Sequence, residues 1–322
     1  MLLSRRQLNA GLLGLGVIGA RSVLAESYPN RPVTIVVPYG PGGVSDVLAR
    51  GLATQLSQHF KQSFIVENRP GAAGAIGTSL VARAKPDGYT LLLGNNGSLA
   101  IAPLLRKTNP FDPMKDFTFI SNALETANFL GINQSTPATS VSQFVEWAKS
   151  QSNPLTFGSP GIGSFGHMSG ELVRQGLGIQ ATHIPYQGTS QAISDLLGGR
   201  IQFMVDPALI QPAFAGRIRI LACAATERFP NAPEIPTFKE LGFDIVSKGW
   251  QGLVGPAGLP TEVRDALSAA VAIAARDEGF RKLLLGIGST PAPDSPQDFA
   301  ERLRRDILRY SAIRTRAGIQ ME

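Results

Sequence analysis

The chain has 322 residues, of which 43% are hydrophobic and 17% are charged. Its length allows two domains with cores of their own, and its composition excludes an intrinsically disordered protein. The formal net charge is +6, but the basic residues form no dense stripe interleaved with aromatic residues, which argues against nucleic-acid binding.

The first 25 residues have the pattern of a removable export signal. Arg5 and Arg6 form a twin-arginine pair, residues 11–20 form an apolar run, and residues 23–25 resemble a cleavage site. The apolar run is shorter than the about 20 residues that span a bilayer, which argues against a membrane anchor. We expect export by the twin-arginine route, with general secretion as the alternative, and a mature chain that starts at Glu26 with a net charge of +3.

From Glu26 onward the pattern alternates strands with helices. We predict strands at residues 33–37, 64–68 and 90–93, and helices at 45–60 and 76–84. Strands joined through helices form a parallel sheet, and ligands of such sheets bind beyond the carboxyl ends of the strands. The loops that follow the three strands are therefore expected to share one edge.

A second sheet of the same kind is predicted between residues 127 and 247, and two long amphipathic helices at 262–276 and 296–318 are expected to pack back on the first. We therefore predict two lobes joined by two crossings, near residues 124–128 and 248–250. Lobe 1 would contain residues 26–126 and 249–322, and lobe 2 residues 127–248. The other predicted elements are strands at 117–120, 129–132, 155–157, 183–186, 201–205, 218–225 and 250–256, with helices at 141–150 and 192–197 and a helix ending near residue 176.

Two loops of near-identical design stand at the centre of the pattern. The first glycine loop covers residues 38–46 and the second glycine loop covers residues 158–166; each follows a strand and opens a helix. Such a turn directs backbone N–H groups and the positive end of the helix dipole at one point. We predict that the two loops face each other and hold a small anion. Because neither loop offers an arginine or lysine, neutral donors and ordered waters are expected around a carboxylate.

One glycine pattern in the chain also occurs in enzymes. Gly161, Gly163 and Gly166 have the spacing of a dinucleotide fingerprint, but residues 186–188 lack the acidic residue that contacts the ribose. The chain contains neither a Gly-Lys-Ser/Thr phosphate loop nor a Gly-x-Ser-x-Gly elbow. An exported nucleotide-dependent enzyme using residues 161–166 is the alternative, and no catalytic residue or cofactor is predicted.

Few residues could bind a metal or react covalently. Cys223 is the single cysteine, so an intramolecular disulfide and a cysteine-based metal cluster are excluded. The histidines lack a carboxylate at ligand spacing, so no metal site is predicted. His183 is expected to be structural, whereas two roles stay open for His167: donation to a bound anion, or capping of its own turn.

Two aspartates follow strands at the expected ligand edge. Asp46 is expected to stabilise the N-terminus of its own helix, where negative charge is favourable. Asp206 precedes a proline and is expected to support a turn. If either carboxylate reaches the ligand, it would hold an amino group or an ordered water.

Seven stretches carry a family signature: residues 37–46, 66–74, 86–92, 170–172, 183–188, 195–201 and 255–260. Taken in this order, they resemble the solute-binding receptors of the tripartite tricarboxylate transporters, the Bug/TctC family, over the whole mature chain. The resemblance implies an α/β, two-lobed periplasmic binding protein of the type II Venus-flytrap kind. Each lobe would be a mainly parallel sheet flanked by helices.

The resemblance also implies the function. A periplasmic, monomeric, non-catalytic receptor would bind a small carboxylate between its lobes and deliver it to permease subunits; a receptor that reports to a sensor kinase is a further alternative. Leu99 departs from the polar residue that the family often has there, which predicts an apolar wall and a flat or aliphatic diacid. Motifs and resemblance together give these candidate ligand-binding residues: Tyr39, Pro41, Gly42, Gly43, Ser45, Asp46, Ala73, Asn95, Ser98, Ser159, Gly161, Gly163, Ser164, His167, Tyr186, Gln187 and Asp206.

Overall fold

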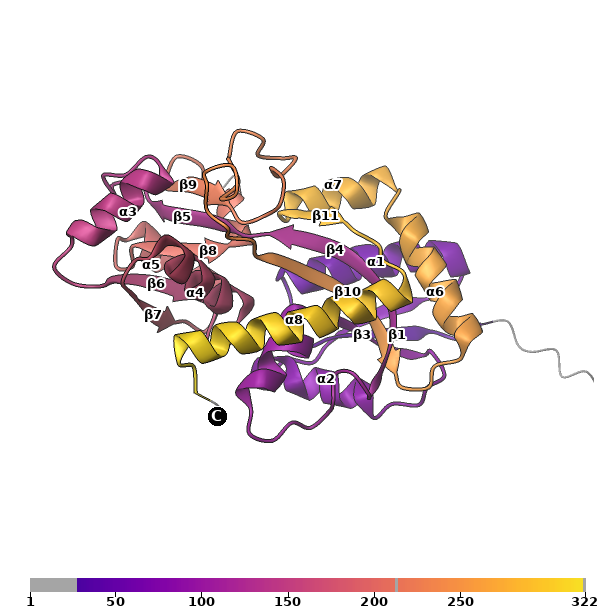
Figure 1. Ribbon diagram of the computed structural model, residues 1–322. Coiled ribbons are helices and arrows are strands. Elements are labelled where there is room, and N and C mark those ends of the chain that lie inside the picture. Colours follow the sequence, from indigo (N-terminus) through magenta and orange to yellow (C-terminus); the bar gives the residue numbers. More distant parts are fainter. Residues whose placement is uncertain (1–27, 212–213, 321–322) are drawn as a thin grey trace, which may run out of the picture.

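The computed structural model describes residues 28–211 and 214–320 (Figure 1). The predicted export signal lies outside these residues. Among the helices in these two ranges, none is long and apolar enough to cross a membrane.

The first sheet has six strands in the order β11-β4-β10-β3-β1-β2. β1 pairs in parallel with β2 and β3, whereas β10 pairs antiparallel with both β3 and β4, and β11 pairs antiparallel with β4. The strands are β1 (Val33–Val37), β2 (Phe64–Asn68), β3 (Thr90–Asn95), β4 (Phe117–Ala127), β10 (Lys248–Pro256) and β11 (Ser289–Pro291).

The second sheet has five strands in the order β7-β6-β8-β5-β9. β6 pairs in parallel with β7 and β8, and β5 pairs antiparallel with β8 and β9. The strands are β5 (Phe129–Asn133), β6 (Leu155–Ser159), β7 (Ala181–Pro185), β8 (Phe203–Asp206) and β9 (Ile218–Cys223).

The two sheets share one strand order. The series β2-β1-β3-β10-β4 of the first sheet matches β7-β6-β8-β5-β9 of the second. The fourth strand of each series, β10 or β5, is the one that enters its lobe from the other lobe. Both sheets are mixed, and among the described strands four of six and four of five point the same way. The predicted two-lobed α/β fold is confirmed. The two glycine loops follow β1 and β6, which occupy equivalent positions.

Helices cover both faces of each sheet because the strand side chains alternate between two apolar faces. In the first lobe, Val33, Ile35 and Val37 pack under α1, α6 and α7, whereas Val36 faces α2 and α8. In the second lobe, α3 and α4 cover one face and α5 covers the other. The helices are α1 (Val44–Phe60), α2 (Ala75–Ala82), α3 (Val141–Ser150), α4 (Phe165–Leu177), α5 (Thr189–Leu197), α6 (Thr261–Ala274), α7 (Glu278–Gly286) and α8 (Pro296–Ala317).

Four short helical turns complete the described chain. One follows β2, one follows β3 and is extended by a third, and the fourth follows β8. They are η1 (Ala72–Gly74), the π-helical η2 (Gly97–Ile101), η3 (Ala102–Leu105) and η4 (Pro207–Ile210).

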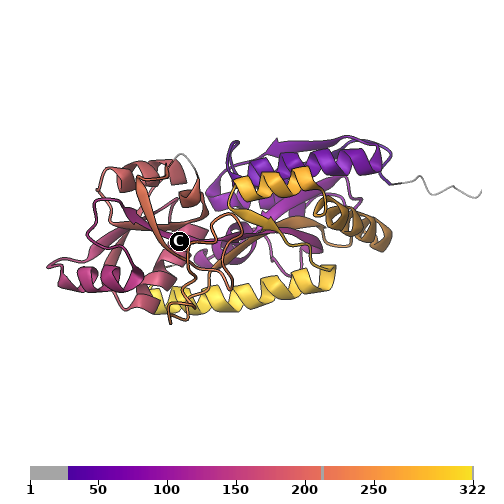
Figure 2. The same ribbon diagram turned by 90° about the horizontal axis from the view of Figure 1, so that it is seen from above.

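Helix α8 runs along both lobes, and its C-terminal half lies beside α4 (Figures 1 and 2). It also holds the strands near the crossings, since Trp250 Nε1 donates to Asp306 at 2.7 Å and Arg302 Nη1 donates to Glu125 at 2.7 Å. The prediction that this helix packs on the first lobe is confirmed, but the sequence did not indicate its contact with the second. The exact lobe limits stay a prediction.

Candidate functional site

Tyr39 joins the loops that follow β1, β2 and β3. Its hydroxyl donates to Asn95 Oδ1 at 3.0 Å, and its carbonyl accepts from Asn68 Nδ2 at 3.1 Å. A Cβ built on Gly74 would lie 3.4 Å from the Tyr39 ring. Burial raises the pKa of Tyr39 to about 12, so its hydroxyl remains a donor at neutral pH. The three loops therefore meet around one tyrosine.

Asn95 and Ser98 form a closed pair beside Tyr39. Ser98 N donates to Asn95 Oδ1 at 2.8 Å, and Asn95 N donates to Ser98 Oγ at 3.2 Å. Ser98 is fully buried, as is Leu99, whose side chain packs in the core cluster of the first lobe. The prediction that Leu99 forms an apolar binding wall is therefore wrong, because the π-helical turn places its side chain inside the lobe.

The first glycine loop presents free backbone donors. Residues 40–43 are exposed, and a Cβ built on Gly40, Gly42 or Gly43 would meet no atom within 4 Å. Within the described ranges, the N–H groups of residues 43–46 have no hydrogen-bond acceptor, and no side chain caps α1. These donors stand at the positive end of a helix of 17 residues, where an anion is stabilised.

Asp46 holds the shape of this loop from its place in the first turn of α1. Its Oδ2 accepts from Gly42 N and from Arg50 Nε, both at 3.0 Å. Burial raises the pKa of Asp46, but the hydrogen bonds from Arg50 and Gly42 outweigh burial, so the pKa falls below its usual value. The carboxylate faces its own loop and neutralises Arg50.

The second glycine loop uses several of its donors internally. Gly161 N donates to Ser159 Oγ at 3.3 Å, and Ser164 N donates to Gly161 O at 3.2 Å. Gly163 N donates to His167 Nδ1 at 3.0 Å, while His167 N donates to Ser164 Oγ at 3.1 Å. These four amides are therefore not available to a ligand in this conformation.

His167 and His183 form a neutral stacked pair behind this loop. Their ring centroids are 3.7 Å apart and their planes differ by 13°. Burial lowers the pKa of His167 to about 4 and, together with the neighbouring His167, that of His183 to about 3. Because His167 Nδ1 accepts from Gly163, of the two roles left open for His167 the structure shows the capping of its own turn.

The remaining candidates of the second lobe lie after β7 and β8. Gln187 is exposed, and the Tyr186 carbonyl lies 3.5 Å from a Cβ built on Gly161. Asp206 accepts from Ala208 N at 2.8 Å and supports the turn η4, as expected. Its side chain is buried without a cation among the described residues, and burial raises its pKa to about 6.

The segment 97–105 connects the two glycine loops in space. At its start, a Cβ built on Gly97 would lie 3.0 Å from the Tyr39 hydroxyl. At its end, a Cβ built on Gly163 would lie 2.0 Å from Leu105 Cδ1. The second glycine loop therefore rests on the first lobe, on the segment that also contacts Tyr39.

Ala73 belongs to a turn with unusual backbone geometry. Residues 71–74 have four consecutive positive φ values, including 50° at Ala72 and 51° at Ala73. L-amino acids other than glycine rarely adopt such values, and they persist where the surroundings hold them. Here Arg106 Nη2 donates to the Ala72 carbonyl at 2.5 Å. No pattern in the sequence pointed to Arg106, which lies outside both loops.

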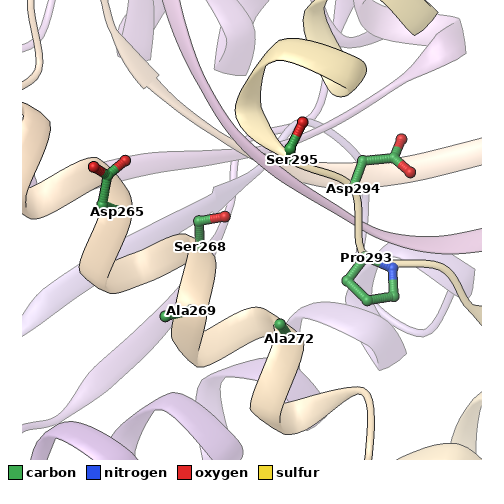
Figure 3. A pocket seen from close by; sticks show the side chains of 7 residues that line it. All are labelled: Asp265, Ser268, Ala269, Ala272, Pro293, Asp294 and Ser295. Carbon is green, nitrogen blue, oxygen red and sulfur yellow. The ribbon is translucent and has the colours of Figure 1, made fainter.

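Other hollows of the molecule lie apart from these loops. Figure 3 shows one of about 450 Å³ between α6 and residues 293–295, where Asp294 is paired with Arg302 at 2.7 Å. It contains none of the candidate residues. Among the described residues, no three His, Cys, Asp or Glu side chains gather in a way that could hold a metal ion.

Comparisons with known proteins identify the family. The model of the "Tripartite tricarboxylate transporter family receptor" matches residues 48–319. A Pseudomonas sp. (strain P51) protein, "UPF0065 protein in tcbD-tcbE intergenic region", is 31% identical over 320 residues, which cover 97% of this chain and 94% of that protein.

Two solved structures from Rhodopseudomonas palustris are also similar. Rpa4515 with adipate has a TM-score of 0.83 and 35% identity, covering 92% of this chain and 100% of that one. MatC with bound malate has a TM-score of 0.77 and 30% identity, covering 89% and 99%. The chain belongs to the receptor family of the tripartite tricarboxylate transporters.

Proposed function

We propose that this protein is a periplasmic receptor that binds a small organic carboxylate between its two lobes and delivers it to the permease of a tripartite tricarboxylate transporter. The observation that carries the proposal is the row of N–H groups at residues 43–46, which begin at the exposed Gly43 before α1 and have no acceptor among the described residues. Adipate in Rpa4515 and malate in MatC support a carboxylate as the ligand.

In this proposal one carboxylate of the ligand binds at the first glycine loop. Gly42 and Gly43 leave room for its oxygens, and the helix dipole of α1 favours its charge. Tyr39 and Asn95 would form the floor behind it, with Ala73 at its side. The proposed contacts on the first lobe are Tyr39, Pro41, Gly42, Gly43, Ser45, Asp46, Ala73, Asn95 and Ser98.

The second lobe would close over the ligand by rotation about the two crossings. A ligand that contacts both lobes only when they are closed shifts the population toward that state. Because the amides of Gly161, Gly163 and Ser164 are occupied, much of the contribution of this loop would come from hydroxyl groups, carbonyls and ordered waters. The proposed contacts are Ser159, Gly161, Gly163, Ser164, His167, Tyr186, Gln187 and Asp206.

The same occupied amides argue against the nucleotide-dependent alternative. A dinucleotide fingerprint needs the glycine-rich turn open toward the pyrophosphate, whereas Gly161 N and Gly163 N donate to Ser159 and His167. We propose no catalytic step and no cofactor. The proposal also includes export through the predicted signal and a monomeric state. Its lobe 1 contains residues 26–126 and 249–322, and its lobe 2 contains residues 127–248.

Isothermal titration of the purified mature protein tests the function. We expect saturable binding of at least one acid from a panel of adipate, malate, succinate and citrate, without added cofactor and with the acid recovered unchanged. NAD and ATP serve as controls and should give no heat of binding. Binding of a nucleotide, with no acid bound, would favour the enzyme. Transport and signalling roles are separated by reconstitution with the permease.

A further inference from the structure

We infer that Arg106 selects ligands with a second carboxylate, which its guanidinium group binds while the first carboxylate is held by the first glycine loop. The inference rests on the proposed function and adds a positively charged residue, which neither glycine loop supplies. It concerns specificity, since it predicts which acids bind better than others of equal length.

The position of Arg106 places its charge between the two lobes. The preceding residue, Leu105, contacts Gly163 of the second glycine loop. The guanidinium itself donates to the carbonyl of Ala72. Arg106 therefore lies where the second lobe rests on the first, next to the turn 71–74.

The turn 71–74 connects Arg106 with the proposed carboxylate site. A Cβ built on Gly74 would lie 3.4 Å from the Tyr39 ring and 3.2 Å from Ser98 Cβ. Ala72 and Ala73, between Arg106 and this contact, are both exposed. A ligand that extends from the first glycine loop along this turn would bring its distal end to the guanidinium group.

The charge of Arg106 is not neutralised, in contrast to the other arginines that follow or flank these strands. Arg50 is paired with Asp46, and Arg69 is paired with Glu67. Within the described ranges, Arg106 has no carboxylate partner, and one bond to a backbone carbonyl is its single hydrogen bond. A guanidinium group has five N–H donors in a planar fork, so donors remain for a second acceptor.

The chemistry of that fork matches a carboxylate. Two parallel N–H groups bind the two oxygens of a carboxylate, and such charge-assisted pairs are stronger than neutral hydrogen bonds. A methyl group at the same place would gain nothing and would strip water from the cation. Diacids should therefore bind more tightly than the matched monoacids.

Matched pairs of acids and matched variants test the inference. Adipate is compared with hexanoate, and succinate with butyrate, by titration of the wild type and of the Arg106→Gln variant. We expect the variant to bind the preferred diacid about tenfold more weakly or worse and to bind its monoacid partner within about twofold of the wild type. Arg106→Lys keeps the charge without the fork and should retain part of the preference.

Lys107 provides the control, because this neighbouring residue is exposed and carries the same charge. Lys107→Gln should leave both affinities within about twofold, since an exposed charge is screened by solvent and salt. Thermal unfolding without ligand checks that Arg106→Gln leaves the turn at Ala72 folded.

Three results would overturn the inference. A wild type that binds diacids no better than monoacids would contradict it, and so would an equal loss for both acids in Arg106→Gln, which would indicate support of the turn alone. Unchanged affinities for both acids in Arg106→Gln would also contradict the inference, although the proposed function would stand. If the wild type binds no acid of the series, the proposed function itself fails.

Discussion

The two glycine loops occupy equivalent positions in two sheets of the same strand order, yet fewer backbone donors are occupied in the first loop than in the second. In the first glycine loop, the N–H groups of residues 43–46 have no acceptor among the described residues. In the second, Gly161, Gly163 and Ser164 donate to groups within the loop or just behind it. Similar turns therefore leave a longer row of unoccupied amides in the first lobe than in the second, which supports the proposed anion site at the first glycine loop.

The difference comes from a few side chains next to the glycines. α1 begins after Gly43, which has no side chain to cap the helix, whereas α4 begins after Ser164, whose hydroxyl accepts from His167 N. In the first loop, Asp46 accepts hydrogen bonds from both Gly42 N and Arg50 Nε. Next to the second loop, His167 Nδ1 accepts from Gly163 N. A glycine pattern thus indicates a turn, but the neighbouring acceptors decide whether its amides remain available.

The strongest test of this difference places the same carboxylate at both helix starts. Gly43→Asp would fill the proposed anion site with the protein's own charge, so we expect ligand affinity to fall by about a hundredfold or more. Gly43 has an extended backbone with φ of −83° and ψ of 174°, and aspartate is a favoured N-cap residue. Folding should therefore be preserved. Titration with the preferred acid measures the loss.

Ser164→Asp is the matched change in the second glycine loop. It also keeps an N-cap acceptor, but the amides of Gly163 and His167 beside it are already occupied. We expect at least tenfold less loss of affinity than for Gly43→Asp. Equal losses would mean that both loops bind the anion directly, and Gly43→Asn separates the effect of charge from that of size.

A second test concerns the contact between the second glycine loop and the first lobe. Gly163 has φ of +70°, and a Cβ on it would lie 2.0 Å from Leu105 Cδ1. Gly163→Ala should lower the free energy of unfolding by about 2–4 kcal/mol, from backbone strain and overpacking together. Gly42 also has a positive φ, of +83°, but open space around it, so Gly42→Ala should cost about 1–2 kcal/mol.

A double-mutant cycle isolates the contact itself. Leu105→Ala in the background of Gly163→Ala removes the clashing methyl group, so the combined loss should be smaller than the sum of the two single losses. Chemical denaturation of the four proteins measures the coupling. Additive losses would show that the second glycine loop does not rest on Leu105 in solution.

The sequence predicted part of the secondary structure with its correct bounds. Local patterns predicted β1 and α3 with the bounds that the structure has, because strong alternation or helical spacing ends there at turn residues. The sequence patterns did not predict α7 and β11, which are short: α7 has nine residues and β11 has three.

The candidate site was predictable in its backbone and less so in its side chains. The glycine patterns predicted two turns at equivalent strand ends. Closure of the second turn depends on His167 and Ser159, and the charge at the lobe contact comes from Arg106, which a helical turn brings back to Ala72. Such tertiary contacts have no fixed spacing in the sequence.

The smallest expected effect uses pH to distinguish the two loops. Burial lowers the pKa of His167 from 6.5 to about 4, so between these values the unfolded state binds a proton that the folded state does not. The free energy of unfolding therefore falls as the pH decreases from 6.5 to about 4, by about 1 kcal/mol per pH unit for this ring. Asp46 behaves differently, because its pKa is lower in the folded protein than the 3.8 of the unfolded chain. Its contribution to the free energy of unfolding is fully present above pH 3.8 and is lost only below it.

His167→Asn keeps an acceptor for Gly163 but does not titrate, so the wild type should lose stability relative to this variant on acidification. The comparison uses the difference between the two proteins because Asp206, with its pKa raised to about 6, acts with the opposite sign: its contribution falls as the pH rises from 3.8 to about 6. Denaturation curves at pH 7, 6 and 5 measure the difference. Parallel curves would mean that His167 takes up its proton as readily in the folded protein as in the unfolded chain. The second glycine loop would then be open to water, as the first one is.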